Sequence, residues 1–148
     1  MIRAVVDANV WVSAFLKPES TPGRLIGAWR RHEFEAHVAS MTVVEVVRAL
    51  SRPRLVEKYH VRWTEVLRFI GDLVAGGTVH DVSKAAPRCR DRTDDVLLEL
   101  AIRLAPCRLV TGDADLLTDA ALVASVQAQG VEIVTPAAFE RVLQTASG

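Results

Sequence analysis

The sequence predicts a three-layer α/β/α sandwich, in which helices cover both faces of a mostly parallel central sheet. Short apolar runs of strand length alternate along the chain with stretches whose apolar residues recur at helical spacing. The 148 residues suit one domain, and no repeat, low-complexity tract or Gly/Ser linker divides them. Half of the residues are apolar, which is enough to bury a sizeable core. We therefore expect a single domain over residues 1–148.

The first half of the chain opens on an expected strand. Ile2–Asp7 is a short apolar run, and Asn9 can cap a helix that ends at Leu16. Thr21 is the expected N-cap of the next helix, because Pro22 then fills its first position. The elements that follow are a strand at 34–39, a helix at 42–50, a turn or short helix at 52–59, and a helix at 64–75 that stops at Gly76 and Gly77.

The second half continues the alternation. A strand is expected at 78–82, and a polar stretch then leads to a helix at 93–104. Further strands are expected at 108–111 and 131–134, and Thr135-Pro136 opens a last helix that reaches about Gln144. Segment 116–129 allows a helix without requiring one, because Ala, Val and Gln dominate it.

Carboxylates fall at the ends of expected strands and at the starts of expected helices. Asp7 closes the first strand, and Asp113 follows the fourth. The carboxyl ends of parallel strands meet at one edge of a sheet, so we expect these two acids to lie together. Asp94 and Asp95 begin the helix before the fourth strand, and Glu45 lies in the first turn of the helix after the second. Whether these three reach the same edge depends on the topology.

Acids that converge in this way require compensation. Two like charges 4 Å apart repel by about 4 kcal/mol at an effective dielectric constant of 20. The group must therefore take up protons or share a cation. Oxygen-only ligands favour Mg²⁺ or Mn²⁺, which can accept a phosphate oxygen and promote attack on a phosphodiester without a protein nucleophile. The chain has 18 basic and 18 acidic residues, so a cation and not the net charge would attract a nucleic acid.

Each acid also has a purely structural interpretation. Thr42 and Glu45 fit a capping box, and Glu45 could instead pair with Arg48. Asp94 and Asp95 both suit a helix N-terminus, so we expect one to cap the helix and the other to bind a ligand. Asp113 and Asp115 are acceptable turn residues. Asp7 is harder to explain structurally, because an acid at the end of an apolar strand is costly unless it is paired.

Residues other than the acids are weaker evidence for a functional site. Asn9 and Ser13 lie four apart and could face the site with Asp7, and Thr111 could orient a ligand or water. Cys89 and Cys107 lack zinc spacing, and so do the histidines. No apolar run has membrane-helix length and no signal-peptide pattern opens the chain, so we expect a reduced cytoplasmic protein without membrane contact.

Five stretches that span almost the whole chain form a recognisable series. The first has the Asp7-Ala8-Asn9-Val10 core of residues 2–13, and the others are Leu50–Leu55, Cys89–Ala101, Leu109–Leu117 and Ile133–Phe139. In their order and spacing they resemble PIN-domain nucleases, in particular the VapC-like toxins of type II toxin–antitoxin pairs. Two features depart from the family: Arg92 stands where a proline is usual, and segment 118–129 is longer than expected.

The resemblance implies a metal-dependent ribonuclease that cleaves RNA, with a small antitoxin as partner and a homodimer as its assembly. It implies that Asp7, Glu45, Asp95 and Asp113 are the catalytic acids, of which all but Glu45 hold Mg²⁺ or Mn²⁺. Asp95 matches better than Asp94 because Val96-Leu97-Leu98 follows it as an apolar helix. The supporting residues are then Asn9, Ser13, Asp94, Thr111 and Asp115.

Basic residues near these acids are candidates for contacts with the RNA backbone, although each is by default a solvated surface charge. They are Arg48, Arg52, Arg54, Lys58 and Arg92. Two rival interpretations stay open. The chain could be a PIN-fold binding module that keeps an antitoxin partner without nuclease activity. A phosphoryl-transfer domain would also place acids at strand ends, but no Asp-x-Asp follows the first strand and no Lys ends the last.

Overall fold

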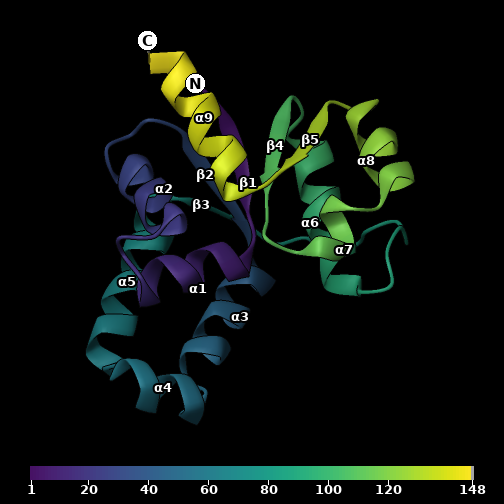
Figure 1. The fold of residues 1–148 in the computed structure, drawn as a ribbon. Coiled ribbons are helices and arrows are strands. Elements are labelled where there is room, and N and C mark those ends of the chain that lie inside the picture. The colour runs from purple at the N-terminus through teal and green to yellow at the C-terminus, as the bar shows by residue number, and fades with distance from the viewer. Residues whose placement is uncertain (148) are drawn as a thin grey trace.

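A computed structural model describes residues 1–147, and these residues form a five-stranded sheet in the order β3-β2-β1-β4-β5 (Figure 1). Every neighbouring pair of strands is parallel. The strands are β1 (Arg3–Val6), β2 (Glu35–Ala39), β3 (Thr78–His80), β4 (Cys107–Val110) and β5 (Val131–Val134). The predicted α/β architecture around a parallel sheet is therefore confirmed.

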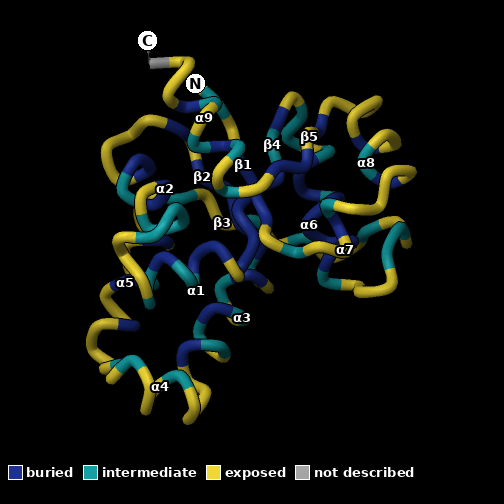
Figure 2. The backbone as a smooth tube through the Cα atoms, viewed as in Figure 1, coloured by how far each residue is buried: buried dark blue, intermediate teal, exposed yellow. Residues whose placement is uncertain are grey.

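Helices cover both faces of the sheet and enclose two apolar cores. One layer contains α1 (Ala8–Leu16), α2 (Thr21–Arg30), α3 (Ser40–Leu50), α5 (Trp63–Gly76) and α9 (Pro136–Ser147), with α4 (Pro53–Tyr59) joining α3 to α5. The other contains α6 (Arg92–Arg103), α7 (Ala114–Leu117) and α8 (Ala120–Gln127). Side chains of a strand alternate between the layers, so Val6 packs into the first core and Val5 into the second. Figure 2 shows most of β1, β2, β4 and β5 and the inner helix faces as the buried part of the chain, whereas the edge strand β3 is largely exposed.

The strand order places β1 beside β4 at the centre of the sheet. The chain builds β1, β2 and β3 outward in one direction and then returns to add β4 and β5 on the other side of β1. The connections after β1 and β4 therefore diverge, and α1 and α7 lie in different layers. A crevice forms at such a switch point, at the carboxyl ends of the strands. The predicted neighbours Asp7 and Asp113 follow these two strands.

Several helices begin at residues other than those predicted. Asp7 caps α1 in place of Asn9, because its Oδ1 accepts the Ala8 N–H at 2.7 Å. Ser20 caps α2 in place of Thr21, and its Oγ accepts the Gly23 N–H at 3.3 Å. Both predicted caps lie inside their helices, because α1 begins two residues and α2 one residue earlier than the sequence pattern suggested.

The predicted capping box at Thr42 and Glu45 is wrong. The chain passes from β2 into α3 without a connecting turn, and Ala39 occupies the cap position with no side-chain bond. Thr42 is consequently inside the helix and buried. Glu45 lies in the second turn of the helix, where it satisfies no terminal N–H group. The neighbouring prediction for α6 is also wrong, since Asp91 caps that helix and neither Asp94 nor Asp95 does.

The remaining segments also differ from the prediction in detail. Strand β3 ends at His80, two residues early. Segment 116–129, left open by the sequence, contains the end of α7 and all of α8, which Asp119 caps through the Leu122 N–H. None of the helices within residues 1–147 has the length and hydropathy needed to span a bilayer.

The cap of α2 can be tested by a pair of substitutions. We expect Ser20→Ala to lower the free energy of unfolding by about 1 kcal/mol, because it leaves the Gly23 N–H without its acceptor. Thr21→Ala leaves that bond in place and should cost clearly less. Urea denaturation of both variants measures the difference, and equal losses would contradict the assignment of the cap to Ser20.

Candidate functional site

A cavity of about 540 Å³ lies at the carboxyl ends of β1 and β4, between α1, α3 and the start of α6. Five acidic residues line it, and we call this cavity the acid pocket. The acids are Asp7, Glu45, Asp91, Asp94 and Asp113. Asn9, Ser13, Thr93, Arg48 and Arg52 also line it. The topology therefore gathers residues that are more than 100 positions apart in the chain.

Asp7 is the most constrained of these acids. Its Oδ1 accepts the Ala8 N–H that begins α1, and its Oδ2 accepts the Thr111 hydroxyl at 2.7 Å and the Asn9 amide at 3.4 Å. The residue is only 7% exposed. Burial raises the pKa of the Asp7 carboxyl, and the bonds from Thr111 and Ala8 only partly oppose this rise. The sequence argument that an acid here requires partners is consistent with these contacts.

Thr111 and Asn9 connect the two strand ends. The Thr111 hydroxyl donates to Asp7 and accepts the Asp113 N–H at 3.0 Å. The Asn9 side chain donates to Asp7 and accepts the Gly112 N–H at 3.2 Å. These bonds fix the segment after β4 against the start of α1. Asp113 is held in turn as the cap of α7, where it accepts the Asp115 N–H at 2.9 Å.

Asp94 lies on the α6 side of the acid pocket. Burial, followed by the negative charges of Asp113, Asp91 and Asp7, raises the pKa of Asp94 to about 7. Asp115 contributes to the same rise but is exposed and does not line the pocket. Asp115 and Asp94 instead meet at a second cavity of about 320 Å³, which adjoins the pocket at Asp91 and Asp94.

Asp95, which the sequence predicted as the ligand in preference to Asp94, does not line the acid pocket, whereas Asp94 does. Its Oδ1 accepts the backbone N–H groups of Arg88 and Cys89 at 2.8 and 2.7 Å. Successive residues of a helix point about 100° apart, and here Asp94 lines the pocket while the Asp95 carboxylate is directed at the backbone of residues 88 and 89. Apolar residues follow both acids, and the sequence pattern therefore could not separate them.

Glu45 faces the pocket from the second turn of α3. Burial and the charge of Asp7 raise the pKa of the Glu45 carboxyl, against smaller opposing effects of a bond from Thr93 and the charge of Arg48. The predicted pairing with Arg48 is therefore at most a minor electrostatic effect. Ser13 lines the pocket from α1, as predicted for a companion of Asp7.

Asp91 is a pocket residue to which the sequence analysis assigned no role. It caps α6 by accepting the Thr93 N–H at 2.8 Å, and its carboxylate also borders the pocket. The available signal was its spacing, since an acid three residues before Asp94 fits an N-cap at the start of an apolar helix.

Only part of the predicted basic set reaches the pocket. Arg48 and Arg52 line it, from α3 and from the residue before α4. Arg54, Lys58 and Arg92 are exposed and lie outside the lining, and the Lys58 ammonium instead stands 5.3 Å from the centre of the Tyr59 ring.

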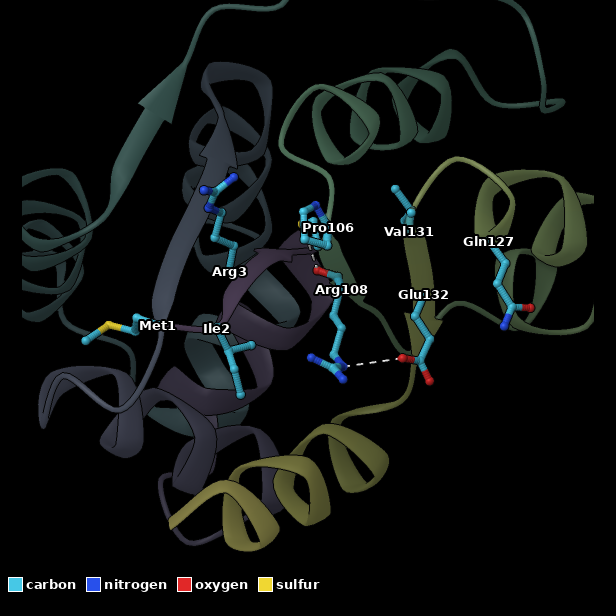
Figure 3. A pocket seen from close by; sticks show the side chains of 10 residues that line it. Met1, Ile2, Arg3, Pro106, Arg108, Gln127, Val131 and Glu132 are labelled. Atoms are coloured by element: carbon cyan, nitrogen blue, oxygen red, sulfur yellow. Dashed lines mark hydrogen bonds and ion pairs between the residues drawn. The ribbon is translucent and has the colours of Figure 1, made fainter.

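A further cavity of about 560 Å³ lies at the opposite, amino ends of the strands (Figure 3). Its acidic lining residue, Glu132, pairs with Arg108 at 3.4 Å. Figure 3 shows Arg3 pointing away from this pair, so the two arginines do not converge on one point. This cavity therefore lacks the grouping of like charges that distinguishes the acid pocket.

The acid pocket suits a hard divalent cation by the chemistry of its donors. Carboxylate and amide oxygens are the ligands that Mg²⁺ and Mn²⁺ take, and the pKa values of Asp7, Glu45 and Asp94 are raised by burial first and then by the negative charges of neighbouring acids. No group of three or more His, Cys, Asp or Glu side chains among residues 1–147 is already arranged as a metal site. The donor set therefore fits, while the ligands would need to adjust around the ion.

Three comparisons relate the chain to known proteins. A sequence model described as the PIN domain matches residues 3–115. An uncharacterized protein of Methanocaldococcus jannaschii is 22% identical over 117 residues, which cover 79% of this chain and 74% of that protein. A PilT N-terminus domain protein of the hyperthermophilic archaeon Sulfolobus solfataricus superimposes with a TM-score of 0.52 at 13% identity, over 97% of this chain and 92% of the other.

The raised pKa of Asp94 predicts that Asp94→Asn stabilises the metal-free protein above neutral pH. Unfolded Asp94 loses its proton near 3.8 and folded Asp94 only near 7, so its contribution to stability is present at acid pH and lost as the pH rises between these values. At pH 8 in EDTA we expect Asp94→Asn to raise the melting temperature by about 3 °C. Asp95→Asn should not raise the melting temperature, because two backbone N–H groups already compensate the Asp95 carboxylate. Calorimetry that finds no gain at pH 8, or the same gain at pH 3, would refute the assignment.

Proposed function

The chain belongs to the PIN domain family, and from this premise we propose that it is a Mg²⁺- or Mn²⁺-dependent endoribonuclease whose active site is the acid pocket. PIN domains are generally nucleases, and the nucleases among them generally use divalent metals. The single observation that carries the proposal is the convergence of five carboxylates on one cavity at the switch point of the sheet. We take residues 1–148 as one such domain.

We propose that Asp7, Asp94 and Asp113 hold the ion. These three approach the pocket from β1, α6 and the segment after β4, and the charges of Asp113 and Asp7 both act on Asp94. Thr111 and Asn9 orient Asp7 and set its distance from Asp113. A bound divalent cation would neutralise charge on the scissile phosphodiester and lower the pKa of a water.

Glu45, Arg48 and Arg52 would act on the same substrate group. Glu45, with a raised pKa, can accept a hydrogen bond or proton from an attacking water. Arg48 and Arg52 line the pocket, where their guanidinium groups can contact the phosphates on either side of the cleaved bond. Arg54, Lys58 and Arg92 lie outside the pocket and remain candidates only for more distant backbone contacts.

The finer role that we propose is that of a VapC-like toxin in a toxin–antitoxin pair, acting on RNA in the cytoplasm. The stretches that resemble this subgroup support it, and they include the segments that contribute Asp7, Asp94 and Asp113. A short reading frame beside the gene would supply the antitoxin, and a gene without such a neighbour would count against the pair.

A binding module without nuclease activity is the second candidate. The observation that favours it is that no three potential ligands among residues 1–147 already form a metal site. The two candidates differ in cation affinity, because a module has no need to hold an ion in the acid pocket. Calorimetry with Mn²⁺ separates them, since absence of binding at millimolar Mn²⁺ favours the module.

We also propose that the homodimer forms through the outer face of α5. Trp63, Leu67 and Val74 are 55%, 54% and 53% exposed on this face, and a Cβ added at Gly71 would meet nothing within 4 Å. A glycine inside an exposed helix weakens that helix. We infer that Gly71 is useful here because it lets a second helix approach closely.

Nuclease activity is tested on single-stranded RNA with Mn²⁺. We expect cleavage that EDTA abolishes, and a loss of at least about 100-fold in kcat for Asp94→Asn and Asp113→Asn, because each removes a ligand from the ion. The matched control is Asp95→Asn, which changes the adjacent acid and should retain activity within about threefold. Cleavage that survives both EDTA and Asp7→Asn would exclude the proposed mechanism.

The dimer is tested by light scattering after size exclusion. We expect the wild-type chain to be dimeric and Leu67→Asp to be monomeric, because a charge on the α5 face would be buried without a partner. Val56→Asp on α4 is the matched control and should remain dimeric. A monomeric wild type at high concentration, or a Leu67→Asp dimer, would remove α5 as the interface.

A further inference from the structure

The segment between β3 and α6 reaches the acid pocket without secondary structure of its own. We call residues 84–91 of this segment the strap. A segment without a sheet or helix ladder must find other partners for its backbone N–H and C=O groups. Three side chains of α6 supply such partners, and they are Asp95, Glu99 and Arg103, spaced four residues apart on one face of the helix.

The contacts follow the strap in order. The Arg103 guanidinium donates to the Lys84 carbonyl at 3.1 Å, and Glu99 accepts the Ala86 N–H at 3.4 Å. Asp95 accepts both the Arg88 and the Cys89 N–H. The Asp95 bonds are the shortest of the series, at 2.8 and 2.7 Å, and they lie nearest to the pocket.

The anchored residues lead directly into the pocket. Two positions after Cys89, Asp91 caps α6 and lines the pocket beside Asp94. Asp91 and Asp94 also line the adjoining cavity, whose wall includes Arg88 and Cys89 of the strap. The position of the strap therefore determines where Asp91 lies and how the acid pocket connects to the adjoining cavity.

We propose that Asp95 is a positioning residue, which holds the strap against α6 and thereby keeps Asp91 at the acid pocket. This inference rests on the proposed function, because it concerns the same site. Asp95 acts through two backbone N–H groups and contributes no ligand to the ion. Its side chain is buried, with the residue only 6% exposed, and it points to the strap and not to the pocket.

An asparagine at position 95 distinguishes this role from that of a ligand. The Asn carbonyl can still accept the two N–H groups of the strap, so positioning survives Asp95→Asn. A metal ligand would not survive it, because the charge that holds the ion is gone. Asp95→Ala removes the acceptor altogether and leaves the Arg88 and Cys89 N–H groups without it.

The experiment measures two quantities on the full chain: the Kd for Mn²⁺ by calorimetry, and amide hydrogen exchange across 84–91 by mass spectrometry. For Asp95→Ala we expect faster exchange in the strap and a rise of about tenfold in the Mn²⁺ Kd. For Asp95→Asn we expect both quantities to stay within about threefold of wild type. Asp94→Asn is the matched control, with unchanged exchange and loss of Mn²⁺ binding.

Two outcomes would overturn the proposal. Loss of Mn²⁺ binding in Asp95→Asn as complete as in Asp94→Asn would make Asp95 a ligand. If amide exchange in the strap of Asp95→Ala is faster but the Mn²⁺ Kd is unchanged, the contact between Asp95 and the strap is merely structural. If Asp95→Ala does not fold, Asp95→Ser gives the same test, because its hydroxyl is too short to hold both N–H groups. Failure of the proposed function is distinguishable, since it shows in wild type as absent Mn²⁺ binding.

Discussion

Repulsion among carboxylates in one small cavity is the constraint on which this molecule depends. Burial removes the water that would screen Asp7 and Asp94, and the charges around them then favour the protonated forms. A fold gains nothing from this arrangement, because apolar side chains would fill the same space at lower cost. A bound cation or a positively charged partner would relieve this repulsion, and such a ligand has access at the switch point of the sheet.

The fold supports the acids through neighbours that carry no charge. Thr111 and Asn9 bridge the ends of β1 and β4, so the distance between Asp7 and Asp113 is set by hydrogen bonds and not by the flexible side chains alone. On the other side, α6 holds Asp94 by its own packing, since Val96, Leu97 and Leu98 anchor the helix in the second core. Rigid elements therefore surround the charges on at least two sides.

The sequence predicted the architecture because short runs rich in apolar residues indicated β1, β2, β4 and β5. It predicted the meeting of Asp7 and Asp113 from the rule for parallel strand ends. It failed where the answer depends on a helix phase or a start residue. Asp94 and Asp95 differ only by 100° around α6, and Glu45 looks like a cap until α3 is known to begin at Ser40. Asp91 went unassigned although its spacing fits an N-cap, because its contact with the pocket appears only in three dimensions.

The carboxyl group of Asp7 both starts a helix and faces the cavity. Its Oδ1 holds the first N–H of α1, whose Trp11 is fully buried in the first core. Position 7 is consequently a poor place to silence the molecule, since a replacement there disturbs folding together with chemistry. Asp94 starts no helix, so a catalytically dead but well-folded reagent for trapping bound strands or companion chains is better made there.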